Sequence, residues 1–301
     1  MKTQLFGITV VMLVVAELLA PRVSFAVDST NAIAPQRYKI AVCDWMILKR
    51  QKLGALQLTK DIGADGVEVD MGSLGTNETF ISPITLDASL RQQFLDKARE
   101  LGLEIPSLAM SGFYAQSFAE RATVPRMTQD CIDTMKAMNV KIAFLPLGVR
   151  SDLLKHPELR SKVVERLKII GAQAEKAGVI IGVETELDAD SQIQLLDDVG
   201  SPAIKLYYNF ANAIQNNRNL IKELLRLGKD RICQIHCTDQ DGVWLQDDPK
   251  INMQNVKSAL DEMGWSGWLV IERSRKANDS RNVKGNFGAN TTYLKSIFQK
   301  P

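Results

Sequence analysis

The chain has 301 residues, of which 45% are hydrophobic and 24% are charged, and its formal net charge at pH 7 is +2. This composition is typical of a globular protein and excludes a disordered or collagen-like chain. Domains that bind nucleic acid usually carry a clear excess or stripe of basic residues, and 37 basic against 35 acidic residues leave no such excess. We therefore expect no nucleic acid among the partners.

The first 26 residues have the features of a secretory signal peptide. An early positive charge precedes an apolar run over residues 5–20, and Ser24 and Ala26 have the small side chains that signal peptidase selects. The uninterrupted part of this run is shorter than the roughly 20 residues that a membrane-spanning helix needs. The sequence predicts cleavage after Ala26 (a 1–26 signal peptide), a periplasmic or secreted protein, and no membrane association once the signal is removed.

Four cysteines follow the predicted signal peptide. Cys233 and Cys237 lie on one predicted strand, about 13 Å apart at roughly 3.3 Å per residue. This separation is too large for a disulfide between them. We expect buried free thiols, with a bridge from Cys43 to another strand as the alternative; the fourth cysteine is Cys131.

After a short N-terminal arm over residues 27–37, runs rich in β-branched residues alternate with amphipathic segments. The predicted strands are Tyr38–Cys43, Gly66–Asp70, Glu104–Ala109, Lys141–Leu145, Val179–Glu184, Ile204–Tyr208, Ile232–Thr238 and Trp268–Glu272. The predicted helices are residues 51–62, 90–101, 128–138, 158–177, 191–198, 216–227, 253–263 and 289–298. Residues 281–288 are expected to form a polar loop before the last helix.

Several of these helices are followed by a glycine, a residue that suits the left-handed conformation at a helix C-terminus. The glycines are Gly63, Gly102, Gly178, Gly228 and Gly264. Strictly alternating βα units predict a parallel sheet. The number of units favours a closed (β/α)8 TIM barrel over residues 38–301, an α/β fold, rather than an open sheet.

Polar residues stand at the ends of the predicted strands, which is where TIM-barrel enzymes carry their functional groups. Glu184, Asn209, His236 and Glu272 lie at or near the ends of four consecutive strands, and Glu68 lies near the end of the second strand. Buried ionised groups cost several kcal/mol unless they are paired or bound to metal. The four residues could therefore converge on one divalent cation. Oxygen ligands with one imidazole suit Mn, Mg, Co or Zn.

Each of these residues also has a structural explanation. His236 could be a core histidine, Asn209 could cap a turn, and Glu68 could form a salt bridge across the barrel mouth. Glu186 and Asp239 lie two or three residues beyond better candidates. Arg273 belongs to a basic cluster that is either a solvated loop or a contact for an anionic substrate.

The strand ends GVEVD, GVETEL, YYNFAN, IHCTD and WLVIERS resemble the xylose-isomerase-like superfamily. This superfamily includes sugar phosphate isomerases/epimerases and relatives of AP endonuclease family 2, and the resemblance covers nearly all of residues 38–300. It implies a TIM barrel. In the ketose epimerases a divalent metal is held by Glu, Asp, His and Glu, which correspond here to Glu184, Asn209, His236 and Glu272.

The chain departs from this pattern at two positions. Asn209 replaces the usual Asp, and Asn212 replaces a histidine that contacts substrate in many epimerases. Because Asn offers only a neutral carbonyl oxygen, we expect the cation to be held less tightly. AP endonuclease relatives need a histidine-rich zinc site, which the 2 histidines of this chain cannot supply.

A cation that polarises a carbonyl and an adjacent hydroxyl eases removal of the proton between them. Glu184 and Glu272 are the expected catalytic pair, one as base and the other as conjugate acid. The sequence predicts a metal-dependent isomerase or epimerase of a small carbohydrate, non-phosphorylated or a keto-sugar because free sugar phosphates are scarce outside the cytoplasm. The expected substrate contacts are Glu68, Glu186, Asn212, Asp239 and Arg273.

Two alternatives remain open from the sequence. Proton abstraction beside a carbonyl also begins β-elimination, so the same site could support a lyase or hydrolase of 3-keto-glycosides. Loss of a metal ligand at Asn209 would also fit a non-catalytic carbohydrate-binding barrel. A homo-oligomer is among the states that the sequence allows.

Overall fold

The predicted strands all form, and they close into one parallel barrel in the order in which they occur in the chain. The structure is a computed structural model, and it describes residues 36–299. The predicted signal peptide, its cleavage site and most of the predicted arm lie outside these residues. The strands are β1 (Tyr38–Cys43), β2 (Gly66–Asp70), β3 (Ser107–Ala109), β4 (Ile142–Pro146), β5 (Ile180–Glu184), β6 (Ile204–Asn209), β7 (Ile232–His236) and β8 (Gly267–Ile271).

The first strand closes the barrel because it pairs on both sides. Ala41 is in register with Gly66 of β2 and also with Val270 of β8. The fold class predicted from the alternating pattern is therefore confirmed.

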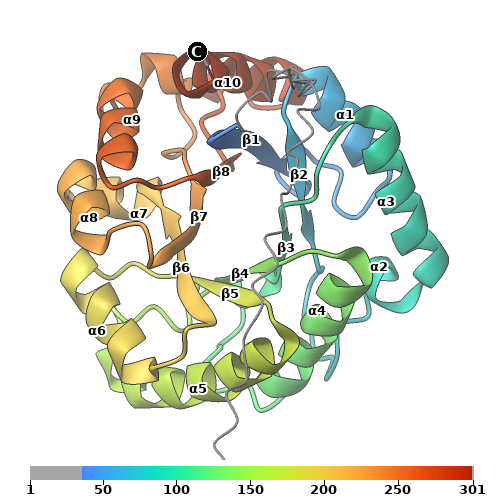
Figure 1. The fold of residues 1–301 in the computed structure, drawn as a ribbon, viewed down its shortest axis with the longest axis vertical. Helices are drawn as coiled ribbons and strands as arrows, with labels where there is room; N and C mark the ends of the chain where they lie inside the picture. Colours follow the sequence, from blue (N-terminus) through green and yellow to red (C-terminus); the bar gives the residue numbers. More distant parts are fainter. Residues whose placement is uncertain (1–35, 300–301) are drawn as a thin grey trace, which may run out of the picture. The chain divides into compact units, whose positions relative to one another are not determined.

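The helices form a ring around the strands (Figure 1). They are α1 (Gly54–Ile62), α2 (Pro83–Leu86), α3 (Ala88–Leu101), α4 (Val124–Met138), α5 (Arg160–Ala177), α6 (Ala189–Val199), α7 (Phe210–Gln215), α8 (Leu220–Leu227), α9 (Met253–Glu262) and α10 (Val283–Phe298). Four of the predicted glycines are the C-terminal caps of α1, α3, α5 and α8, whereas the C-terminal cap of α9 is Met263, one residue before Gly264.

Two hydrophobic cores hold the barrel. The larger one lies between the strands and the helices. The smaller one fills the inside of the barrel and consists of Ala41, Cys43, Ala109, Phe144, Tyr207 and Val270. Residues that alternate along a strand face these two cores in turn. A polar side chain in the inward set is therefore surrounded by the other strands.

The structure shifts most predicted boundaries by a few residues, and it changes three segments in ways that have a local cause. β3 begins at Ser107 instead of Glu104, because Pro106 has no backbone N–H to continue a ladder. The predicted helix over 216–227 is replaced by α7 and α8, and Asn219 caps the second of them by accepting from Lys222 N. The predicted polar loop over 281–288 is wrong, because Asn282 caps α10 and the helix starts at Val283.

All four cysteines fall within the described residues, and all are unpaired there, as the strand geometry predicts for Cys233 and Cys237. Across residues 36–299, no helix combines the length and the apolar character that a bilayer crossing requires.

Candidate active site

The four residues expected to bind a cation come together at the carboxyl ends of their strands. Glu184 and Asn209 are the last residues of β5 and β6, His236 ends β7, and Glu272 directly follows β8. None of these residues is more than 5% exposed. The closed barrel brings the four side chains to one point because the ends of parallel strands share one rim.

Asn209 connects the two glutamates. Its Nδ2 donates to Glu184 Oε2 at 3.1 Å and to Glu272 Oε2 at 3.2 Å. Its Oδ1 accepts from the backbone N–H of Ala211 and caps α7. The two sets of contacts fix the amide orientation, because the reversed amide would face carboxylates with its oxygen and a backbone N–H with its NH2.

His236 lies between carboxylates on both sides of its ring. Nδ1 is 3.3 Å from Glu184 Oε2 and 3.8 Å from Glu272 Oε2, whereas Nε2 is 3.2 Å from Glu68 Oε1. Burial by itself lowers the pKa of His236, but the three carboxylates outweigh it and raise that pKa to about 10. Burial raises the pKa of Glu272; the nearby Glu184 adds to this rise and His236 opposes it.

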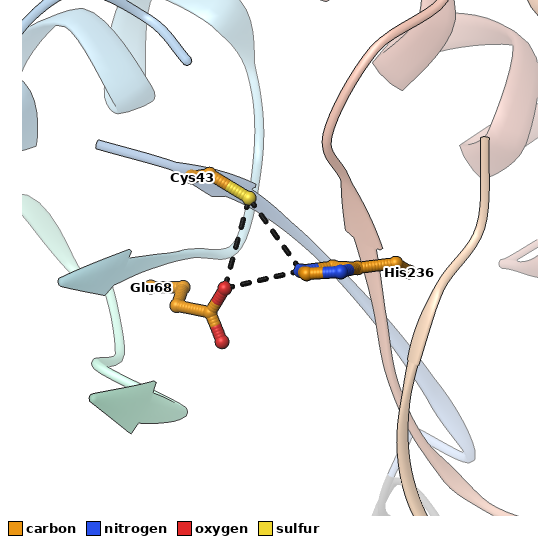
Figure 2. A group of neighbouring side chains, drawn as sticks. All are labelled: Cys43, Glu68 and His236. Atoms are coloured by element: carbon orange, nitrogen blue, oxygen red, sulfur yellow. Dashed lines mark hydrogen bonds and ion pairs between the residues drawn. The ribbon is translucent and has the colours of Figure 1, made fainter. Parts of the chain in front are cut away.

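Glu68 lies inside the barrel beside the His236 ring, with no exposed surface (Figure 2). It accepts hydrogen bonds from Ser107 Oγ (2.5 Å), Tyr207 OH (2.6 Å) and Cys43 Sγ (3.7 Å), in addition to its contact with His236. Both carboxylate oxygens are engaged by the protein. This placement argues against the substrate contact that the sequence suggested for Glu68.

Tyr114 is a site residue that the sequence analysis missed. It lies in a short 3-10 helix after β3, Ser111–Tyr114, and its OH donates to Glu184 Oε1 at 2.8 Å. Burial, and next the charge of Glu184, raises its pKa well above the usual value, so the hydroxyl keeps its hydrogen. No motif marked Tyr114, because its position depends on how one loop packs on the next.

A cavity of about 90 Å³ adjoins Glu184. Two predicted substrate contacts line it: Asn212, whose Nδ2 donates to Thr185 O (3.2 Å), and Glu186, which accepts from Asn216 Nδ2 (2.8 Å). Tyr114, Asp152, Lys155 and Glu184 complete its charged and aromatic lining. The structure therefore places two of the predicted contacts beside the catalytic candidates.

The other two predicted contacts lie away from this cavity. Asp239 is bound by Gln215 Nε2 at 2.5 Å and by Lys250 Nζ at 3.4 Å, and it is 3% exposed. Arg273 is partly exposed, and its Nε is 3.9 Å from Glu272 Oε1. Neither is among the residues that line the cavity beside Glu184.

Potential ligands for a cation lie on two sides of the His236 ring, one at Nε2 and one at Nδ1. On the Nε2 side, potential ligand atoms of Cys43, Glu68 and His236 lie within 4.8 Å of one another, close enough to hold a metal ion. Burial, and next the charge of Glu68, raises the pKa of Cys43, so this thiol keeps its hydrogen and is a poor ligand. Glu68 already accepts hydrogen bonds from its protein neighbours, so no ion is needed to satisfy its carboxylate on this side of the ring.

The side of the ring at Nδ1 fits a cation better than the side at Nε2. Atoms that share one cation at about 2.1 Å lie roughly 3 to 4 Å apart, and Nδ1 of His236 is at such distances from an oxygen of Glu184 and of Glu272. The two carboxylates also provide the negative charge that a divalent ion needs. Asn209 presents its NH2 group to the same two oxygens, so its carbonyl is not aimed at this position.

The closed barrel and the polar rim define a class of protein, the TIM-barrel enzymes with functional groups at the carboxyl ends of their strands. The profile of the xylose isomerase-like TIM barrel family matches residues 56–296, and the chain belongs to this family. The family resemblance of the strand-end motifs is therefore confirmed.

The chain is similar to proteins that are named as epimerases. The chain is 24% identical over 181 residues to 2-epi-5-epi-valiolone 7-phosphate 2-epimerase from Actinoplanes sp. and spans 63% of the length of that relative (59% of this chain). D-psicose 3-epimerase from Clostridium cellulolyticum H10 has the same fold, with a TM-score of 0.66, 11% identity, and coverage of 86% of this chain and 99% of that one. 3-Keto-D-glucoside 4-epimerase from E. coli gives a TM-score of 0.66, 13% identity, and coverage of 86% and 99%.

Proposed function

We propose that the protein is a sugar isomerase or epimerase that moves a proton next to a carbonyl group, with Glu184 and Glu272 as the proton-transferring pair. The observation that carries the proposal is the meeting of these two buried carboxylates at one rim, both bonded to Asn209 and both facing Nδ1 of His236. One carboxylate takes the proton from one side of the carbon and the other returns it. The similarity to an epimerase supports the same class of reaction.

We infer that the reaction uses a divalent cation, Mn, Mg, Co or Zn, with Glu184, His236 and Glu272 as its protein ligands. When bound, such a cation would polarise the carbonyl and its neighbouring hydroxyl. The remaining work falls to the chain itself. Tyr114 holds Glu184 at Oε1, and Asn209 holds both glutamates, so the pair is fixed before substrate binds.

The charges of the cavity beside Glu184 favour a substrate without phosphate. Its lining has three carboxylates, Asp152, Glu184 and Glu186, against one ammonium group, that of Lys155. The ammonium is 2.8 Å from Asp152 Oδ2 and is already paired. A phosphate would be repelled here, whereas hydroxyl groups can donate to carboxylates. We therefore propose a neutral sugar or keto-sugar, in contrast to the 7-phosphate in the name of the relative.

A screen of ketoses and 3-keto-sugars in D2O tests the proposal, with phosphorylated counterparts in parallel. An isomerase or epimerase incorporates deuterium from solvent at the carbon next to the carbonyl. Glu184→Gln and Glu272→Gln should each lower the rate of incorporation by about 10²–10⁴-fold, the usual contribution of a positioned acid or base. The matched control is Glu165→Gln on the exposed surface of α5, which should leave the rate unchanged.

The outcomes separate the candidate functions. Equal rates for Glu184→Gln and the unmodified protein would contradict the catalytic pair. Release of the aglycone from a 3-keto-glycoside, with the same dependence on Glu184, would instead support the lyase. Sugar binding without deuterium incorporation in any substrate would support a carbohydrate-binding barrel.

We also propose that the protein is exported and acts in the periplasm or outside the cell. The basis is the predicted signal peptide over residues 1–26. N-terminal sequencing of the protein from a bacterial host should find Val27 as the first residue. An N-terminus at Met1 in the mature protein would contradict export by this route.

A further inference from the structure

We propose that Glu68 is a positioning residue, which binds the Nε2–H of His236 and thereby directs Nδ1 toward the two glutamates at the rim. The inference rests on the function proposed above. It gives Glu68 a role without substrate contact, and it connects the inside of the barrel to the site at its mouth.

Glu68 is surrounded by hydrogen-bond donors from other strands. Ser107 of β3 and Tyr207 of β6 both donate to Oε2, at 2.5 Å and 2.6 Å. His236 Nε2 is 3.2 Å from Oε1. An ionised carboxylate has only acceptor sites, so a buried Glu68 is stable in this position because every neighbour can donate to it.

Gln234 fixes the direction of these hydrogen bonds. It lies two residues before His236 on β7, and its Nε2 donates to Ser107 Oγ at 2.9 Å and to Tyr207 OH at 2.8 Å. The two hydroxyl hydrogens then remain for Glu68. A reversed Gln234 amide would take both hydroxyl hydrogens, and Oε2 of Glu68 would face two oxygen lone pairs at close distance.

The contact with Glu68 determines which nitrogen of His236 carries a hydrogen. Because Glu68 can only accept, Nε2 of His236 carries a hydrogen, and a neutral imidazole then has its lone pair on Nδ1. Nδ1 is the nitrogen that faces Glu184 and Glu272, at 3.3 Å and 3.8 Å. A histidine that binds a metal usually donates its other N–H to a carboxylate or carbonyl, and loss of that partner typically lowers metal affinity about 10–100-fold.

Cys43 provides a matched control within the same cluster. Its Sγ is 3.7 Å from both Glu68 Oε1 and His236 Nε2 and forms the third corner of the group in Figure 2. A thiol is a weak donor. Cys43→Ala therefore removes a neighbour of Glu68 and His236 without removing the acceptor of Nε2–H.

The histidine content makes a direct test practical. The chain has 2 histidines, and the other one, His156, is partly exposed. In the His156→Gln variant, ¹⁵N-labelled histidine reports on His236 alone. NMR should show a hydrogen on Nε2 that exchanges slowly with solvent, both without cation and with Zn²⁺, and Nδ1 as the nitrogen without hydrogen when Zn²⁺ is present. An Nε2 without hydrogen in either sample would overturn the proposal.

Variants of Glu68 extend the test to cation affinity, measured with Mn²⁺ by calorimetry. Glu68→Leu should weaken binding about 10–100-fold, Glu68→Gln should restore part of the affinity, and Cys43→Ala should match the unmodified protein. A folded Glu68→Leu variant with unchanged Mn²⁺ affinity would overturn the proposal. If Glu68→Leu does not fold, the NMR result on the His156→Gln protein decides.

The cation of the proposed function and the positioning role of Glu68 can be contradicted by different results. If the unmodified protein binds no divalent cation, the cation assigned in the proposed function is wrong. In the same cation-free sample, an Nε2–H of His236 that exchanges slowly in the unmodified protein and faster in Glu68→Gln still shows whether Glu68 holds the ring. If Mn²⁺ binds but Nε2 lacks a hydrogen, the proposed function stands and the role of Glu68 is wrong.

Discussion

At the residue scale, Asn209 holds Glu184 and Glu272 close together when no cation is bound. A pair of buried carboxylates repel each other unless something positive or a donor lies between them. The NH2 group of Asn209 supplies two hydrogen bonds at this point, and its oxygen is used at the N-terminus of α7. The amide therefore stabilises Glu184 and Glu272 in the place where a cation would act, and it competes with that cation.

Asn209→Asp should make the stability of the protein depend on a divalent cation. Asp is as good as Asn at a helix N-terminus, so the contact with Ala211 can remain, but the new carboxylate faces Glu184 and Glu272 without donors. We expect a loss of about 3 kcal/mol in a chelator, as for other uncompensated buried charges. Mn²⁺ should then raise the melting temperature of the variant far more than that of the unmodified protein.

Thermal unfolding with EDTA and with Mn²⁺ measures this difference. Asn212→Asp is the control, because it also adds a carboxylate near the cavity while leaving the contacts of Asn209 in place. Equal Mn²⁺ shifts for the unmodified protein and Asn209→Asp would show that the amide does not compete with a cation.

The sequence identified the residues at the rim but not those beneath them. Glu184, Asn209 and His236 each end a strand and Glu272 directly follows one, and strand ends could be located from the alternating pattern. Tyr207 and Gln234 lie two residues before Asn209 and His236, so the period of two in a strand places them on the same inward face. This period was present in the sequence, and it places Tyr207 and Gln234 among the polar side chains around Glu68.

At the element scale, the loops after β3 and β4 determine the position of Tyr114. A Cβ on Gly148 would lie 2.3 Å from Tyr114 Cα and 2.5 Å from Tyr114 O, closer than any such contact allows. The backbone N–H of Val149 also donates to Tyr114 O at 3.1 Å. The two loops therefore pack backbone against backbone, and this contact holds the Tyr114 hydroxyl at Glu184.

Gly148→Ala should separate these loops. We expect a destabilisation of about 1–3 kcal/mol, as for other overpacked positions, together with a lower rate of deuterium incorporation because Tyr114 moves away from Glu184. Tyr114→Phe removes the same hydrogen bond without moving the backbone, so it should lower the rate with a smaller loss of stability. Urea unfolding and the deuterium assay measure the two effects.

Gly54→Ala is the matched control for this substitution. Gly54 is the first residue of α1, and no atom lies within 4 Å of an added Cβ. Alanine there should leave activity unchanged and stability equal or higher, by up to about 1 kcal/mol. A Gly148→Ala protein as stable and active as Gly54→Ala would show that the loops tolerate the methyl group.

Elements that depend on a local pattern could be predicted, and elements set by contacts between distant segments could not. The helix ends at Gly63 and Gly102 were visible, because a left-handed cap requires only the chain near it. The contact of Gly148 with Tyr114 joins two loops 34 residues apart (148 − 114). Nothing in either loop alone distinguishes it from an ordinary connection.

At the scale of the whole molecule, strand closure and packing hold the barrel together without disulfides. β1 pairs with both β2 and β8, and one continuous core lies between the strands and the helices of the described chain. Cys43, Cys131 and Cys237 are buried in the structure, and Cys233 is partly buried. Burial raises the pKa of each of these thiols, which slows oxidation because the thiolate is the reactive form.

The stability of the protein should therefore not depend on reductant, even if it is exported to an oxidising compartment. The melting temperature should be the same with and without dithiothreitol, because no loop of the unfolded chain is closed by a disulfide. Ellman's reagent should react slowly with the folded protein and should titrate all 4 thiols after unfolding in guanidinium chloride. A melting temperature that falls on reduction, together with fewer than 4 thiols in the unfolded oxidised protein, would show that exported molecules form a bridge absent from this structure.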